Sequence, residues 1–108
     1  MASAGDLRRI ALSLRGTVEV PHFNRAAFKV VRIYVTLAPD GRTANFKLTP
    51  DEQEFKCMLA PNSFTPVVGA WGKQGWTTGT LARMDIADLR AALEMAWHHA
   101  QSHKPRRQ

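Results

Sequence analysis

The chain has 108 residues, a formal net charge of +6 and an isoelectric point of about 10.3. A chain of this length forms one domain and can bury a core without disulfides. Its single cysteine, Cys57, excludes an internal bridge. No apolar run approaches the ~18 residues needed to cross a bilayer, and the first residues do not resemble a secretory signal. These features predict a cytoplasmic protein, without membrane association and most simply monomeric.

The excess of positive charge favours encounters with polyanions such as nucleic acid. Three basic residues, Lys104, Arg106 and Arg107, lie in the last five positions, and the remaining residues still carry +3. The segment from Arg15 to Lys47 holds six basic residues against two acidic ones. Many soluble domains are mildly basic without binding nucleic acid, so the charge alone does not decide between these alternatives.

Apolar residues near the N-terminus recur at helical spacing, which predicts a helix from about residue 4 to residue 15. Ser3 and Asp6 form a variant of the capping box at its start, and Gly16 marks its end. From residue 17 to residue 48 the apolar spacing changes to two. This predicts three or four antiparallel strands, the first covering 17–20 and ended by Pro21, with a turn at 39–42.

A capping box at Thr49 and Glu52, with Pro50 in the first helical position, predicts a second helix. Its apolar stripe consists of Phe55, Met58 and Leu59. Short strands are expected at 64–67 and 76–81, separated by a loop of glycines and tryptophan at 69–75. A long helix follows, opened by Asp85.

This order, α-β-β-β(β)-α-β-β-α, predicts an α+β fold with an antiparallel sheet of five to six strands and helices packed on one face. Residues 1–103 would form the single domain, and residues 104–108 a disordered basic tail.

Strand alternation assigns one row of side chains to the sheet face that the helices leave uncovered. Aromatic rings can stack on bases while basic groups contact phosphates, so this mixture suits nucleic acid. A solvated polar face is the alternative, and Trp76 could equally pack against Trp71 or His22 as a second small core. The predicted members of the row are Lys29, Tyr34, Thr36, Thr43, Asn45, Lys47, Trp76, Thr78 and Thr80.

Several segments resemble the MmcQ/YjbR family of small bacterial proteins. They are Pro21-His22-Phe23, Ala27-Phe28, Ala44-Asn45-Phe46-Lys47-Leu48 and, as the most specific one, Gly69-Ala70-Trp71-Gly72-Lys73-Gln74-Gly75-Trp76-Thr77. The resemblance covers nearly the whole chain and implies an α+β fold with an antiparallel sheet and flanking helices. It also implies DNA binding through two wing-like hairpins. Val20 and Asn24 depart from the expected pattern beside His22.

Carried over position by position, the distinctive residues of the family fall on His22, Phe23, Lys47, Trp71 and Trp76. The two wings would be the turn at 40–42 and the loop at 69–75. Their tips would be Arg42, Lys73 and Gln74, which could contact a phosphate or a base edge.

Other chemistry finds little support in the sequence. Gly72-Lys73 lacks the remainder of a phosphate-binding loop motif. His99 and His103 have the spacing of a zinc-ligating pair but no third ligand nearby, and surface histidines are the simpler interpretation. Cys57 has no adjacent base that would activate it. We therefore predict no catalytic residue, no metal site and no cofactor.

The leading hypothesis is a non-catalytic module that binds DNA or another nucleic acid. Its contact residues would be Arg25, Lys29, Arg32, Arg42, Lys47, Lys73, Gln74, Trp71 and Trp76. Alternatively, a pocket formed by His22, Phe23, Lys47, Trp71 and Trp76 would bind a small anionic ligand, with or without chemistry on it. A protein-interaction domain that uses the same aromatic face is a third possibility.

Overall fold

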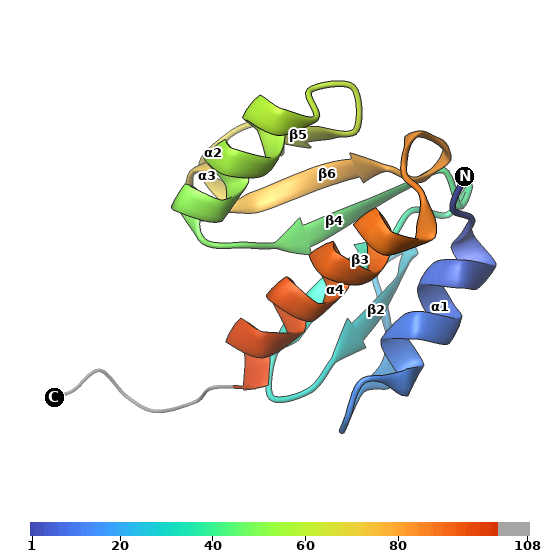
Figure 1. Ribbon diagram of the computed structural model, residues 1–108. Coiled ribbons are helices and arrows are strands. Elements are labelled where there is room, and N and C mark those ends of the chain that lie inside the picture. Colours follow the sequence, from blue (N-terminus) through green and yellow to red (C-terminus); the bar gives the residue numbers. More distant parts are fainter. Residues whose placement is uncertain (102–108) are drawn as a thin grey trace, which may run out of the picture.

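The computed structural model describes residues 1–101 and confirms the predicted α+β class (Figure 1). Six strands form one antiparallel sheet in the order β1-β2-β3-β4-β6-β5. The predicted tail at 104–108 lies outside the described residues. No helix within residues 1–101 is long and apolar enough to cross a membrane. The elements in chain order are α1 Ala4–Ser13, β1 Val18–His22, β2 Arg25–Lys29, β3 Ile33–Leu37, β4 Thr43–Lys47, α2 Pro50–Leu59, β5 Phe64–Pro66, α3 Ala70–Lys73, β6 Trp76–Thr80, the 3₁₀ turn η1 Leu81–Arg83 and α4 Ile86–Gln101.

The predicted helix starts are confirmed by their capping hydrogen bonds. At α1 the Ser3 hydroxyl accepts from the backbone N–H of Asp6, and the Asp6 carboxylate accepts from the backbone N–H of Ser3. Thr49 and Glu52 form the same reciprocal pair at α2. These bonds satisfy N–H groups that have no partner inside the helix. The short helix α3 lies in the segment where the sequence predicted only a loop.

α1 and α4 pack on the same face of the sheet and enclose the core (Figure 1). Strand residues two apart point to this face, which explains why the apolar rows of β2, β3 and β4 are buried. The largest buried side chains of the core include Phe28, Val35, Phe46, Leu7, Ile10, Leu89 and Leu93. The other face of the sheet is open. Cross-strand pairing places a row of residues on this open face, each opposite its neighbour on the next strand. The row begins at Val20, passes through Thr36, Asn45 and Thr78, and ends at Thr65.

The prediction that Tyr34 lies on the open face is wrong, because this side chain is fully buried beneath α1. The pairing of β2 with β3 shifts between Phe28 and Lys29, so Tyr34 is an extra residue in β3. Such a bulge places two successive side chains on one side of the sheet. The Tyr34 hydroxyl lies 2.8 Å from the Thr17 hydroxyl and 3.3 Å from the Ala11 carbonyl oxygen, near the end of α1.

β1 also differs from the prediction, because the strand continues through Pro21 to His22. β1 is an edge strand that pairs only with β2, and an edge strand tolerates the missing N–H of proline. The continued pairing sets His22 opposite Arg25. β1 and β2 are therefore joined by a tight hairpin, and its loop lies beside the open face.

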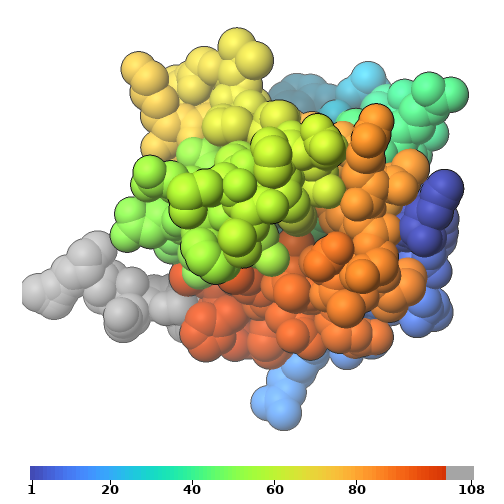
Figure 2. Space-filling model, turned by 45° about the horizontal axis from the view of Figure 1, so that its top comes forward, coloured from blue at the N-terminus to red at the C-terminus, as the bar shows by residue number. Residues whose placement is uncertain are grey.

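The apolar stripe predicted for α2 is not buried. Phe55, Met58 and Leu59 are each more than half exposed, and α2 has no buried residue. α2 packs on the edge strand β5 beside α4, where Cys57 contacts the core and Lys56 lies over the Phe64 ring. Figure 2 shows α2 (green) beside α4 (orange to red), with its outer surface uncovered.

Replacing Tyr34 with Phe should lower the free energy of unfolding by about 1–2 kcal/mol, because the Thr17 hydroxyl and the Ala11 carbonyl lose a partner. Urea unfolding followed by circular dichroism measures this loss. In the Tyr34→Phe/Thr17→Val double variant the two losses should be less than additive, since both partners of one hydrogen bond are removed. Full additivity would contradict the bond.

Candidate ligand-binding cavity

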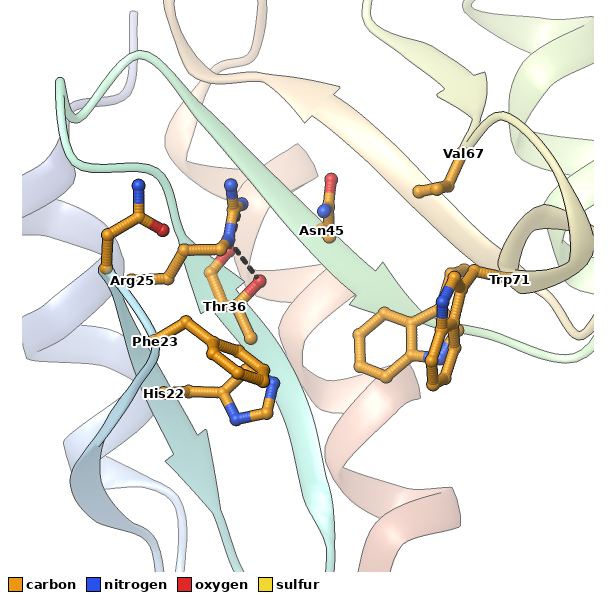
Figure 3. A pocket seen from close by; sticks show the side chains of 9 residues that line it. His22, Phe23, Arg25, Thr36, Asn45, Val67 and Trp71 are labelled. Atoms are coloured by element: carbon orange, nitrogen blue, oxygen red, sulfur yellow. Dashed lines mark hydrogen bonds between the residues drawn. The ribbon is translucent and has the colours of Figure 1, made fainter.

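A cavity of about 410 Å³ lies on the open face of the sheet (Figure 3). It lies between the β1–β2 hairpin and the segment from Val67 to Trp76. We call residues 68–75 of this segment the tryptophan loop. The floor of the cavity is formed by the central strands. The residues that line it are His22, Phe23, Asn24, Arg25, Thr36, Asn45, Val67, Trp71 and Trp76.

Two pairs of aromatic rings form opposite sides of the cavity (Figure 3). The centroids of the His22 and Phe23 rings are 4.8 Å apart, and those of Trp71 and Trp76 are 6.5 Å apart, both in edge-to-face geometry. Phe23 is 93% exposed and Trp71 is 61% exposed. Each pair therefore leaves apolar ring surface in contact with solvent, which is unusual for side chains of this size.

The backbone of Phe23 is strained in a way that presents its ring to the cavity. Phe23 and Asn24 form the two-residue loop between β1 and β2, and Phe23 has φ of 59°. Glycine usually takes the positive φ of such hairpins, because a side chain there costs roughly 1–3 kcal/mol. Strain of this kind clusters at functional sites.

Hydrogen bonds between neighbouring strands fix the floor of the cavity. Arg25 donates from Nε to the Thr36 hydroxyl over 2.9 Å and from Nη2 to the Thr36 carbonyl over 3.3 Å. The Thr78 hydroxyl donates to Oδ1 of Asn45 over 2.8 Å. Burial lowers the pKa of Arg25, and the nearby Asp40 carboxylate partly offsets this shift.

Two glycines allow the tryptophan loop to pack closely on its neighbours. A Cβ atom on Gly72 would lie 1.7 Å from the Val67 carbonyl oxygen, and one on Gly75 would lie 1.9 Å from that of Leu48. Gly75 also has φ of +106°. No other residue type fits at these two positions without moving the backbone.

Polar side chains from β4 and α2 hold the loop in place. Gln53 donates from Nε2 to the carbonyl oxygens of both Gly72 and Trp76, each over 2.9 Å. Lys47 donates from Nζ to the Gln74 carbonyl oxygen over 2.7 Å. Burial and the neighbouring Arg32 lower the pKa of Lys47, while Glu52 opposes this shift. Lys47 thus holds the loop and does not line the cavity.

A carboxylate–imidazole contact links the start of α2 to the end of α4. Nε2 of His99 lies 2.8 Å and 2.9 Å from the two carboxylate oxygens of Glu52. Burial raises the pKa of Glu52, but hydrogen bonds from the Thr49 backbone and from His99 outweigh it, so this pKa lies below its ordinary value. Because Gln53 follows Glu52, the contact also supports the tryptophan loop.

The remaining predicted contact residues lie at varied distances from the cavity. Lys73 and Gln74 are exposed on the tryptophan loop beside Trp71. Lys29 is partly exposed on the open face at the far end of β2. Arg32 donates to the His99 carbonyl oxygen at the end of α4 over 2.8 Å, on the helix side of the sheet.

The two proposed wings do not project side by side. β4 and β6 are antiparallel, with Thr43 opposite Thr80 and Lys47 opposite Trp76. The turn that carries Arg42 precedes Thr43, and the tryptophan loop precedes Trp76. The two segments therefore lie at opposite ends of this strand pair, roughly 13 Å apart along the strands.

Four lining residues were missing from the predicted contact sets, namely Asn24, Thr36, Asn45 and Val67. Strand alternation had placed Thr36 and Asn45 on the open face, and this signal could have added them. Nothing in the sequence indicated Val67. Within residues 1–101 no cluster of three or more His, Cys, Asp or Glu side chains could hold a metal ion. Burial raises the pKa of the Cys57 thiol, which favours its protonated form.

Comparison with known proteins places this arrangement in a family. The YjbR family model matches residues 12–99, which span the sheet, the cavity and most of α4. The chain belongs to the YjbR family. Among solved structures, it is similar to Deinococcus radiodurans protein DR2400, described as a DUF419 domain, with a TM-score of 0.76 and 24% sequence identity over 89% of this chain and 76% of that one. The latter similarity supports the fold alone. The comparison with curated proteins finds no match.

Replacing Gly75 with Ala should destabilise the YjbR-type tryptophan loop far more than replacing Gly69 with Ala. Both glycines have positive φ, so both variants introduce backbone strain of roughly 1 kcal/mol. Only at Gly75 does the new Cβ meet backbone, because no atom lies within 4 Å of the Cβ position at Gly69. Urea unfolding and near-ultraviolet circular dichroism of the tryptophans measure the difference. Equal effects would contradict the close approach to Leu48.

The Glu52 contact should make stability depend on pH in acid. The folded-state pKa of Glu52 is lowered, so its contribution is present above the unfolded-state pKa of about 4.3 and is lost as the pH falls through the folded-state value. The wild type should therefore exceed Glu52→Gln in unfolding free energy at pH 6, and this difference should shrink towards pH 3. A constant difference across this range would contradict the assignment.

Proposed function

We propose that this YjbR-family protein binds single-stranded nucleic acid without catalysis, and that the cavity receives one base. The observation that carries this proposal is the pair of exposed aromatic walls facing each other across a polar floor. Base–aromatic stacking tolerates every base and supplies roughly 1–3 kcal/mol for each stacked base. The floor side chains would contact the edge of the stacked ring.

The shape of the cavity favours a single strand over a duplex. The cavity holds about 410 Å³, which suits one base and part of its sugar but not a double helix. Bases within a duplex are already stacked on their neighbours and cannot enter a pocket without being unpaired. The separation of the Arg42 turn from the tryptophan loop along the strands is a further argument for a single strand over a duplex held by two paired wings.

The backbone of the strand would meet basic groups at the rim of the cavity. Lys73 is exposed on the tryptophan loop at this rim, while Arg25 adds positive charge on the floor between the two aromatic walls. Lys29 extends the positive charge along the open face. Together with the net charge of +6, these groups would attract the phosphates and orient the strand.

The cavity also supports a second candidate function, a site for a small planar anion. Its volume lies within the usual range for small-molecule sites, and Arg25 supplies a cation at the floor. Replacing His22 with Ala should then abolish binding of the small ligand while leaving affinity for long single strands nearly unchanged. Strong binding of short oligonucleotides and none of mononucleotides would favour the first function.

Replacing Trp71 with Ala should weaken binding of a fluorescently labelled single-stranded oligonucleotide about 5- to 150-fold, because one stacking surface is lost. The matched control is Phe55→Ala, which removes an aromatic ring that is also more than half exposed, from α2 and away from the cavity. Fluorescence anisotropy measures both affinities. Equal losses in the two variants would mean that the cavity is not the binding site.

Replacing Lys73 with Ala should make binding less sensitive to salt. Each phosphate neutralised on a single strand contributes about −0.7 to the slope of log K against log salt concentration, so the slope should shrink by about that amount. Arg90→Ala removes an exposed cation from α4 and should leave the slope unchanged. A variant ending at His103 tests the basic C-terminal residues in the same way. Binding lost only in that variant would contradict the cavity as the site.

A further inference from the structure

The hydrogen bonds on the cavity floor leave donor groups of two lining side chains without a protein partner within residues 1–101. Oδ1 of Asn45 is occupied by the Thr78 hydroxyl. In this orientation of the amide the two hydrogens of Nδ2 have no acceptor within residues 1–101. An amide that is fixed at its oxygen presents its NH₂ group as a donor only.

Arg25 adds to the same pattern. Its Nε and Nη2 atoms are directed at Thr36, and no partner within residues 1–101 accepts from Nη1. The Thr36 oxygen atoms in turn accept from Arg25. Thr36 and Asn45 lie directly opposite each other in the β3–β4 pair, so their Cβ atoms are separated by about 5 Å. The unused donors of Arg25 on β2 and Asn45 on β4 thus lie on either side of Thr36 on β3, beneath the aromatic walls.

Two donors that are held in place select a ligand edge with acceptors and reject one that presents a donor. A donor facing a donor leaves both groups unpaired in a partly buried site, which is costly. Guanine carries adjacent acceptors at O6 and N7, and cytosine carries them at O2 and N3. In adenine the N1 and N7 acceptors each lie beside the N6 amino donor.

We propose that the floor of the cavity makes the site selective for a base with two adjacent acceptors, guanine or cytosine, over adenine. Asn45 and Arg25 would be the specificity-determining residues, and Thr78 would be a positioning residue that fixes the orientation of the Asn45 amide. This inference rests on the proposed function, since it requires that a base enters the cavity.

The test compares oligonucleotides of seven deoxyadenosines with strands in which the central base is guanine or cytosine. A single well-placed pair of hydrogen bonds discriminates by about 1–3 kcal/mol, so at least one substituted strand should bind about 5- to 150-fold more tightly than the all-adenine strand. Fluorescence anisotropy with the full chain measures each affinity. The relative affinities of the two substituted strands show which of the two bases the site prefers.

Two isosteric variants test whether Asn45 and Thr78 determine the base preference. The quantity compared is the affinity for the guanine or cytosine strand divided by the affinity for the all-adenine strand, because a general change in charge alters both affinities alike and leaves this ratio unaffected. Asn45→Asp replaces the donor with an acceptor, and the preference should move towards adenine. Thr78→Val frees the amide to rotate, and the preference should shrink although binding persists. Arg90→Ala, which removes an exposed side chain from α4 on the helix-covered side of the sheet, should leave the ratio unchanged.

The outcomes separate the two proposals. If every strand binds with equal affinity, or if Asn45→Asp leaves the ratio unchanged, the base preference is wrong and nucleic-acid binding stands. If no strand binds to the wild type in moderate salt, both proposals fail. Circular dichroism of each variant confirms that it has folded before its affinities are compared.

Discussion

α1 and α4 pack on the same face of the six-stranded sheet, and strand alternation then decides which side chains meet solvent on the other face. Phe28, Val35 and Phe46 fill the space beneath the helices. Their immediate neighbours in sequence therefore point the other way. A single row of small and polar residues crosses all six strands on the open face, and Thr36, Asn45 and Thr78 form its centre. The cavity exists because no helix covers this row.

The aromatic walls depend on backbone geometry more than on the aromatic residues themselves. Trp71 reaches the cavity because Gly72 and Gly75 let the tryptophan loop lie against Val67 and Leu48. Phe23 reaches it from the opposite side through a strained hairpin loop. Gln53 and Lys47 hold the loop through its carbonyl oxygens, and α2 is in turn linked to α4 through Glu52. Side chains that do not line the cavity thus hold one of its walls in place.

Membership of the YjbR family and the similarity to DR2400 account for the fold, while the function has to be argued from the site. The charge and the rings together favour a polyanion with planar groups. Only the hydrogen bonds of the floor add chemical selectivity, because they determine which of the polar atoms remain free. A solvated sheet face would not need two exposed aromatic pairs, and an apolar docking surface would not need a floor of fixed donors.

The sequence by itself determined the class of fold, the helix starts and most of the open face, because these depend on local capping chemistry and on spacing of period two. It also singled out His22, Phe23, Trp71 and Trp76. It placed Tyr34 on the wrong face, since a bulge in β3 arises from pairing with β2 and leaves no local signal. It assigned Lys47 to the pocket, whereas this side chain does not line the cavity and donates to the Gln74 carbonyl oxygen, because spacing cannot show which carbonyl a long side chain reaches. The tertiary structure alone decided that the hairpin and the tryptophan loop meet across one cavity, since strands distant in sequence bring them together.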